Sequence, residues 1–304
     1  MINLDEIQSA LDYIAAIDEN DEQAYEKILK TFINIRFIPV FTNTFSKNED
    51  SGRLRATFRT RTHTDTKFFQ KLNDISYPPS LTIKSYARCN RPNQSVFYCA
   101  ENRPTSYMEL VEYWAKEKNI GDKIAVTIGM WEFQRDLNLC IIPKPQNRIT
   151  DSEKLYGEIY DKKMAEGGYD KNMKDLSDLI FSFMYEQFSR PAKNDKKTYF
   201  ITSAFTNLIM MNPNIDGILY PSVPYGGNGF NSAIKRSVVE TGGIKLVHVT
   251  KDTFKIRETE EGKHNFLQID SFSTNNINNE SGEIKWNHFR HFIKRILQFS
   301  NPFT

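Results

Sequence analysis

The segment YARCNRPNQSVFYCAENRPTSYMELVE, residues 86–112, predicts a loop, a strand and a helix in direct succession. Its first part is basic and broken by a proline, and SVFYCA (95–100) is a short apolar run. A helix is expected from the next proline onward, because proline is favoured in the first turn. Arg88, Tyr98 and Glu109 are spaced so that a cation, an aromatic ring and a carboxylate could meet at one cleft.

A second segment far along the chain, GILYPSVPYGGNGFN (217–231), predicts a strand that ends at Ser222. Side chains at strand ends are held rigidly and still reach a ligand. The glycine-rich loop that follows could bring its backbone close to a ligand. It has neither the GK[ST] ending of a P-loop nor a GxGxxG pattern, and Ser222 lacks a GxSxG context. These motifs therefore do not support a nucleoside triphosphatase, a dinucleotide Rossmann site or a serine hydrolase.

Composition sets few limits on function. The chain has 304 residues, 13% aromatic, and a net charge of +2, so its total charge does not indicate binding to nucleic acid or to an anionic membrane. Its apolar runs are shorter than the ~20 residues of a membrane-spanning helix, and its beginning lacks the features of a signal peptide. The three cysteines form no CxxC pair and the histidines no metal-ligand grouping. We expect a cytoplasmic protein without a bound metal.

The segment RLRATFRTRT (53–62) alternates between apolar and basic residues. One interpretation is an exposed edge strand whose charges prevent aggregation. The other is a wall that binds phosphate, because guanidinium groups match phosphate oxygens in bidentate pairs. The alternation by itself favours the edge strand. The arginines on this face are Arg53, Arg55, Arg59 and Arg61.

Several short blocks of this chain, over roughly residues 53–250, resemble those of the RES-domain family, which is named for an Arg, a Glu and a Ser. The matching blocks here are FRTR (58–61), ARCNRPN (87–93), FYCAE (97–101), PTSYME (104–109) and YPS (220–222). Ala87, Cys89 and Asn93 depart from the family's arginine block. Both Arg88 and Arg91 therefore stay open as the matching arginine.

The resemblance implies an α+β fold with a split, mostly antiparallel β core of the ADP-ribosyltransferase type, surrounded by helices. It also implies an enzyme that degrades NAD⁺ by phosphorolysis or hydrolysis, as a bacterial toxin or defence effector. NAD would be substrate, not cofactor. The implied catalytic residues are Arg88, Glu109 and Ser222, and the implied NAD-binding residues are Arg59, Arg61, Tyr98 and Asn228.

The residue types suit this chemistry. Cleavage of the nicotinamide–ribose bond builds positive charge on the ribose, which a carboxylate such as Glu109 can stabilise. Arg88 and Arg59 would hold the pyrophosphate, Tyr98 the nicotinamide end, and Ser222 the ribose, the phosphate or the nucleophile. Water, phosphate or a macromolecule could be the acceptor. The alternatives are an ADP-ribosyltransferase acting on a protein or nucleic acid, and a non-enzymatic binding module.

We expect three segments in the chain: a helical one at 1–45, a RES-like catalytic domain at 46–260 and a C-terminal extension at 261–304. A charged helical insertion at about 150–195 is expected to be a solvated lid or spacer. Expected partners, beyond NAD, are inorganic phosphate and an antitoxin or regulatory protein, but neither a membrane nor nucleic acid.

Two further expectations concern the C-terminal third. The segment IKLVHVTKDTFKIRET (244–259) predicts two strands with a turn at Lys251–Asp252. The polar segment 261–283 is expected to be a loop or linker. The stretch 284–299 has apolar and basic residues on opposite sides at helical spacing, which predicts an amphipathic helix docked on the core, with a weaker possibility of partner binding.

Overall fold

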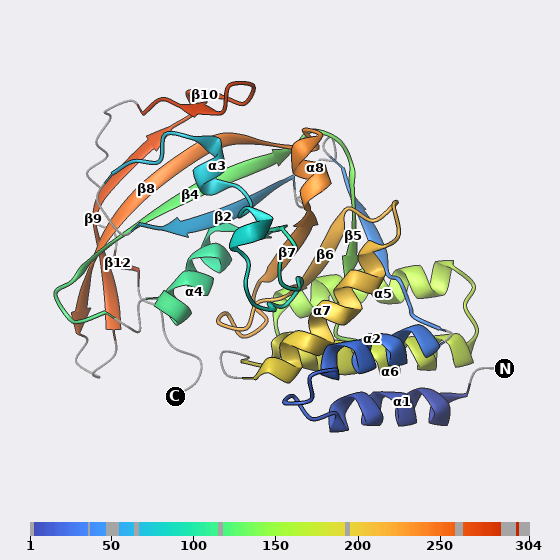
Figure 1. Ribbon diagram of the computed structural model, residues 1–304. Helices are drawn as coiled ribbons and strands as arrows, with labels where there is room; N and C mark the ends of the chain where they lie inside the picture. The colour runs from blue at the N-terminus through green and yellow to red at the C-terminus, as the bar shows by residue number, and fades with distance from the viewer. Residues whose placement is uncertain are drawn as a thin grey trace.

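A computed structural model of the chain shows a large, curved sheet with helices gathered mainly against one of its halves (Figure 1). The residues that it describes are 3–35, 37–46, 55–63, 67–114, 118–191, 195–258, 264–286 and 296–297.

Ten of the described strands form the sheet, in the order β1-β5-β6-β7-β3-β2-β4-β8-β9-β12. Among these described strands, neighbours run antiparallel except for β5 and β6, which are parallel. This mixed, mostly antiparallel arrangement is consistent with the expected α+β class. The bounds are β1 Thr42–Phe45, β2 Ala56–Thr62, β3 Val96–Ala100, β4 Lys123–Phe133, β5 Leu137–Ile141, β6 Gly217–Pro221, β7 Phe230–Lys235, β8 Ile244–Glu258, β9 His264–Thr274 and β12 Ile296–Leu297.

The sheet is nearly divided between β3 and β2. In the described chain these strands pair at one position, where Phe58 lies opposite Ala100. By contrast, β2 pairs with β4 along its whole length. Beyond that position side chains take over from backbone pairing: the Thr57 hydroxyl donates to the Ala100 carbonyl at 2.9 Å, and Arg59 donates to the Tyr98 carbonyl. The sheet therefore consists of two half-sheets that diverge from a short junction.

Helices cover the two half-sheets differently (Figure 1). α6 and α7 contact β6, with α1 packed on α6 and α2 on α7, whereas α4 packs on β2 and β3 and contributes Tyr107 to a separate apolar cluster with β4, β8 and β9. The two N-terminal helices agree with the sequence prediction. The bounds are α1 Leu4–Ala16, α2 Ala24–Asn34, α3 Leu72–Ile75, α4 Arg103–Trp114, α5 Asp151–Glu166, α6 Lys171–Ser189, α7 Lys196–Met210 and α8 Arg236–Glu240, with a 3-10 turn at Ser80–Thr82 and a small hairpin of β10 Ile277–Asn278 and β11 Glu283–Ile284.

The charged segment 150–195 is helical as expected, but it is not a solvated lid. α6 places Ile180, Phe181, Met184 and Phe188 at helical spacing, and each of these side chains is buried. They belong to one large cluster of buried apolar residues that extends from Ile7 to Ile284 and includes residues of all three expected segments. The helices of this segment therefore help to complete the core, and one of its charged residues, Glu153, is itself buried.

The prediction that 53–62 is an exposed edge strand is wrong. β2 lies between β3 and β4 in the middle of the sheet, and Arg59 is buried. The alternation of charge cannot distinguish an exposed face from a face whose arginines find buried carbonyl acceptors. Arg53 lies outside the described residues, and Arg55 is exposed at the start of the strand.

The segment 244–259 contains one long strand instead of two, since β8 continues through Lys251 and Asp252. Asp252 is fully buried, and its carboxylate accepts hydrogen bonds from Arg103 at 2.6 Å, Gln268 at 2.9 Å, Ser271 at 2.6 Å and the Tyr107 hydroxyl. These four donors remove the cost of burying a charge that local propensity would place in a turn.

The polar segment 261–283 is also not a linker. Its residues from 264 to 274 form β9, which pairs with β8. Of the expected helix at 284–299, residues 287–295 lie outside the described chain, while Ile284 and residues 296–297 belong to strands. In the described ranges, no helix combines the length and the apolar character needed to cross a membrane.

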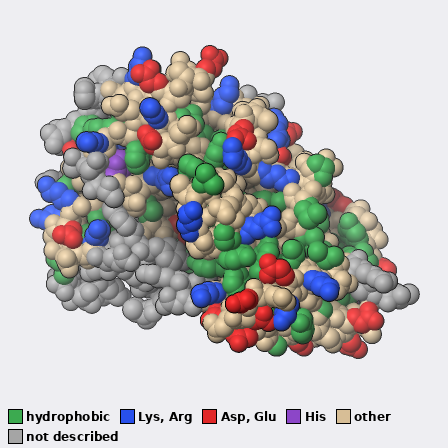
Figure 2. Space-filling model, in the orientation of Figure 1, with side chains coloured by type: hydrophobic (Ala, Val, Ile, Leu, Met, Phe, Trp, Pro, Cys, Tyr) green, Lys and Arg blue, Asp and Glu red, His purple; other side chains and the backbone are tan. Residues whose placement is uncertain are grey.

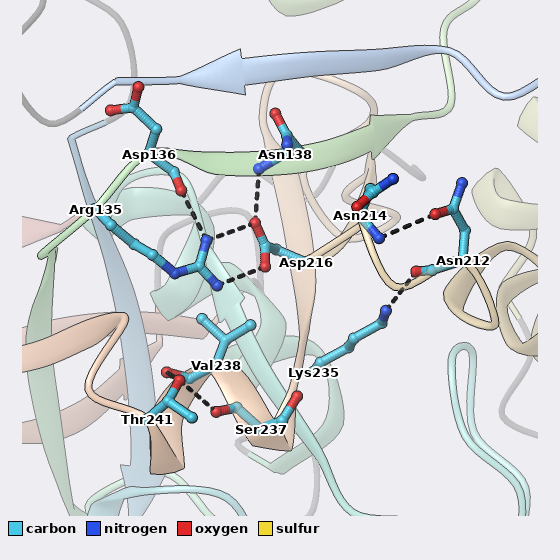
Figure 3. Close-up of polar contacts among 10 residues, drawn as sticks. All are labelled: Arg135, Asp136, Asn138, Asn212, Asn214, Asp216, Lys235, Ser237, Val238 and Thr241. Atoms are coloured by element: carbon cyan, nitrogen blue, oxygen red, sulfur yellow. Dashed lines mark hydrogen bonds and ion pairs between the residues drawn. The ribbon is translucent and has the colours of Figure 1, made fainter.

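A polar network fixes the beginning of β6 (Figure 3). Arg135 donates to both oxygens of Asp216, at 2.9 and 2.7 Å, and the backbone N–H of Asn138 donates to the same carboxylate at 2.9 Å. The backbone N–H of Lys235 donates to the Asp216 carbonyl at 2.8 Å. Strands β5, β6 and β7 are thus held in register at the end of β6 opposite to Ser222.

We predict that Asp252→Asn destabilises the fold. An amide N–H cannot accept the hydrogen bonds of the donors around Asp252, and leaving a buried donor without its partner costs about 1–3 kcal/mol. The matched control is Glu132→Gln, the same change of carboxylate to amide at an exposed position of β4. Urea denaturation of both variants measures the free energy of unfolding, and equal stabilities would contradict the prediction.

Candidate functional site

A cavity of about 300 Å³ lies where the two half-sheets diverge. Its walls come from β2, β3, α4, α7, β6, β7 and the loop before β3, so it joins both segments singled out in the sequence. A second cavity, of about 480 Å³, lies between residues 37–42 and helices α5 and α6. None of the predicted site residues is among the described residues that line this second cavity.

Glu109 from α4 lines the first cavity. Two neutral donors from the opposite segment converge on its Oε1 atom: the Ser222 hydroxyl at 2.7 Å and the Asn231 side-chain amide at 2.6 Å. The structure therefore brings Glu109 and Ser222 together across 113 residues of sequence. A carboxylate held from two sides keeps one orientation in the cavity.

Ser222 does not line the cavity itself, and its connection to the cavity is its hydrogen bond to Glu109. Its side chain is 1% exposed and is not part of the cavity wall. Its backbone is fixed as well, because its N–H donates to the Gly229 carbonyl at 2.8 Å and its own carbonyl accepts from Gly227 at 3.1 Å. In this arrangement the hydroxyl supports the carboxylate and does not itself face a ligand.

Arg88 lines the cavity, whereas the cavity wall does not include Arg91, which is exposed. The Arg88 guanidinium donates to two backbone carbonyls at the C-terminal end of α6, Gln187 at 3.4 Å and Arg190 at 2.5 Å. It also lies over the ring of Tyr199, 5.9 Å from the ring centre. Of the two arginines left open by the sequence, Arg88 is the one placed to meet an anion in the cavity.

Tyr98 presents its ring to the cavity and uses its hydroxyl to hold the neighbouring loop. The hydroxyl accepts from the backbone N–H of Cys89 at 2.8 Å and donates to the Asn90 side chain at 2.8 Å. Burial raises the pKa of Tyr98 well above its ordinary value, so the hydroxyl stays protonated and can donate. Tyr98 therefore fixes the loop that carries Arg88.

Arg59 also lines the cavity, but its guanidinium is committed to the protein. It donates to the Ser76 carbonyl at 3.0 Å and to the Tyr98 carbonyl, and it lies 5.4 Å from the centre of the Phe97 ring. Burial lowers the pKa of Arg59 to about 9, so the group is still charged at neutral pH. Arg61 is not part of the cavity wall and donates to the Asp74 carbonyl at 3.3 Å.

Asn228 lies outside the cavity wall. It is exposed, and its side chain donates to the Tyr225 carbonyl at 3.0 Å. The loop that carries it is held by the N-terminus of α5, where the Thr150 hydroxyl donates to the Gly227 carbonyl at 2.7 Å. Gly227 has a φ of 76°, a backbone conformation that favours glycine.

Asn231, which the sequence analysis did not single out, lines the cavity and donates to Glu109, whereas Asn228, expected to bind NAD, lies outside the cavity wall. The available signal was an asparagine inside a strand, where this residue is depleted unless its amide has a partner. The sequence reading also missed the cavity wall formed by Tyr199, Tyr220 and the hydrogen-bonded hydroxyl pair of Thr60 and Ser106. Thr60, Ser106 and Tyr220 lie within the family-like blocks, but the resemblance gave them no role, and the packing of distant elements brings them and Tyr199 to the cavity.

On the face of the molecule shown in Figure 2, several lysine and arginine side chains lie over the middle. Acidic side chains gather over the N-terminal helices. In the part of the chain that the structure describes, His, Cys, Asp and Glu side chains form no group of three that could hold a metal ion. The charges lining the cavity are those of Arg59, Arg88 and Glu109.

We predict that Tyr98→Phe lowers the free energy of unfolding by about 1–2 kcal/mol, because it leaves the Cys89 N–H and the Asn90 side chain without this partner. Tyr199→Phe, which removes a hydroxyl from the same cavity wall, should change it by less than about 0.5 kcal/mol. Thermal or urea denaturation measures both values. An equal loss in the two variants would contradict the role given to the Tyr98 hydroxyl.

Comparisons with protein-family models, with curated proteins and with solved structures found no match to this chain.

Proposed function

We propose that this protein cleaves the nicotinamide–ribose bond of NAD⁺, by phosphorolysis or hydrolysis, in the cavity between the half-sheets. The observation that carries the proposal is the Glu109 carboxylate, fixed by Ser222 and Asn231 in a cavity that Arg88 also lines. The choice of NAD⁺ as substrate comes from the resemblance of the blocks described above to those of the RES-domain family. The split sheet supports the ADP-ribosyltransferase-like architecture that they imply.

The chemistry needs a fixed negative charge beside the ribose. When the bond between C1′ and the pyridinium nitrogen breaks, its electron pair goes to nicotinamide, which leaves as a neutral molecule. The ribose carries the positive charge until an oxygen of water or phosphate bonds to C1′. Water then loses a proton, and phosphate forms the glycosyl phosphate directly. Glu109 would stabilise the positive charge electrostatically, without needing to act as an acid.

Arg88 would bind the phosphate groups. Guanidinium groups form strong, charge-assisted hydrogen bonds with phosphate oxygens. The rings of Tyr98, Tyr199 and Tyr220 line the same cavity and provide flat apolar surfaces for a nicotinamide or adenine ring. Arg59 would add positive charge to the cavity wall while its hydrogen bonds hold β2 to β3.

The biological role that we propose is a toxin or defence effector that acts in the cytoplasm by depleting NAD⁺, with an antitoxin or regulatory protein as a partner. The direct test is release of nicotinamide from NAD⁺ with and without inorganic phosphate. ADP-ribose as product indicates hydrolysis, a phosphorylated ADP-ribose indicates phosphorolysis, and label on a macromolecule indicates transfer. Folded protein that releases no nicotinamide under any of these conditions would refute the proposal.

Glu109→Gln should lower the rate of nicotinamide release by about 100-fold or more, because it removes the charge that the transition state needs. The amide is close in size to the carboxylate, so circular dichroism and the melting temperature should change little. Glu158→Gln, the same substitution at an exposed position of α5, serves as control and should keep full activity. Comparable rates for both variants would exclude Glu109 as the catalytic carboxylate.

Arg88→Ala should raise the KM for NAD⁺ by about tenfold or more, which corresponds to the loss of a hydrogen bond to a charged group. Arg91→Ala should leave KM unchanged, since Arg91 does not line the cavity. Steady-state kinetics of the two variants decide between the arginines. A larger increase in KM for Arg91→Ala than for Arg88→Ala would show that Arg91, and not Arg88, binds the phosphate groups.

A further inference from the structure

We infer that Asn231 is a positioning residue that, together with Ser222, keeps Glu109 oriented and negatively charged in the cavity. The inference rests on the proposed function, in which Glu109 is the catalytic carboxylate. It assigns a role to a residue outside the Arg, Glu and Ser of the sequence blocks.

The first argument is rigidity. Asn231 lies on β7, opposite Tyr220 of β6 on one side and Ala100 of β3 on the other. Ala100 in turn pairs with Phe58, so this row of residues crosses the junction between the half-sheets. The Asn231 side chain is 6% exposed. Strand pairing on both sides fixes the Asn231 backbone, and burial restricts its side chain. The side-chain amide therefore has little freedom to move, and it defines where Oε1 of Glu109 lies.

The second argument is the chemistry of the two donors. The Asn231 amide nitrogen can donate but cannot accept, and it does not titrate in the range of protein stability. It lies 2.6 Å from the same Oε1 atom to which Ser222 donates at 2.7 Å. A proton on this oxygen would face the Asn231 N–H, which cannot accept it, whereas the Ser222 hydroxyl could rotate to accept it. Hydrogen bonds donated to a carboxylate favour its charged form over its neutral form.

The third argument concerns the other groups around Glu109. The charged and titratable side chains that line the cavity with it come from β2, β3, β6, α7 and the loop before β3. Burial lowers the pKa of Arg59 to about 9, raises the pKa of Cys99 to about 12, and raises the pKa values of Tyr98 and Tyr220 well above their ordinary values. Among the residues that the structure describes, the charged and titratable side chains that line the cavity beside Glu109 are Arg59, Arg88, Tyr98, Cys99, Tyr199 and Tyr220.

The consequence is that a loss of activity on acidification should report protonation of Glu109. Asn231→Asp tests this, because it places a second carboxylate against Oε1 without a large change in shape. Two carboxylates at this distance cannot both ionise easily, so the pair keeps one shared proton to a higher pH than a single carboxylate would, as in aspartic proteases. The acid limb of the pH–rate profile for nicotinamide release should move up by about one pH unit or more. At a pH on the acid limb of the native profile, activity should fall about tenfold, and it should recover as the pH rises.

The matched control is Asn275→Asp, the same substitution at an exposed position outside the cavity wall. Its pH–rate profile should coincide with that of the native protein. A purely structural role for Asn231 predicts instead a loss of equal size at every pH. That result, or an equal shift in the Asn275→Asp profile, would overturn the inference.

A second measurement does not depend on turnover. In protein labelled with ¹³C at the glutamate side-chain carboxyl, the Glu109 signal is the one lost in Glu109→Gln. Its titration midpoint should rise in Asn231→Asp and, by a smaller amount, in Asn231→Ser. The serine variant keeps a neutral polar group at this position, so it serves as the test if the aspartate variant does not fold. Asn275→Asp should leave the midpoint unchanged.

The two measurements separate the inference from the function on which it rests. If the native protein releases no nicotinamide while the Glu109 midpoint responds to Asn231, the proposed function fails and the positioning role stands. If the native protein is active and the midpoint is the same in all the variants, the positioning role fails and the function stands.

Discussion

A buried guanidinium joins the two halves of this protein. The backbone ladder between β2 and β3 ends after a single residue pair, and Arg59 bridges the gap by donating to the Tyr98 and Ser76 carbonyls. Burying this charge is expensive, as its lowered pKa shows, and the carbonyl acceptors offset part of that cost. Because β2 and β3 diverge there, a cavity opens between two half-sheets that would otherwise form one continuous sheet.

The candidate site follows from this divergence. α4 begins directly after β3 and therefore carries Glu109 to the mouth of the gap, while β6 and β7 bring Ser222 and Asn231 to the same point. The loop with Arg88 is tied by Tyr98, a residue of the diverging strand itself. Each side chain is held by a regular element or by a bond to one, which is the condition for a preorganised site.

The sequence predicted the elements whose pattern depends on local burial. The α1 and α2 helices lie in the segment expected to be helical, β6 lies in the segment expected to be a strand, and the contact between Glu109 and Ser222 agrees with the family-like blocks. The errors occur where polar residues find distant partners. The central position of β2, the unbroken β8 through Asp252, and the role of Asn231 depend on donors or acceptors contributed by other strands and helices. Local propensity contains no information about those partners.

The bonds of Arg88 to the last carbonyls of α6 have a thermodynamic consequence. The Arg88 guanidinium interacts with the negative, C-terminal end of the α6 dipole, and an anion in the cavity would compete for the same group. An anion that pulls this group away from Gln187 and Arg190 must also supply the free energy of releasing the helix end. The affinity for such an anion would therefore include the free energy of releasing the C-terminal end of α6, so a substitution at that helix end would change binding without touching the cavity.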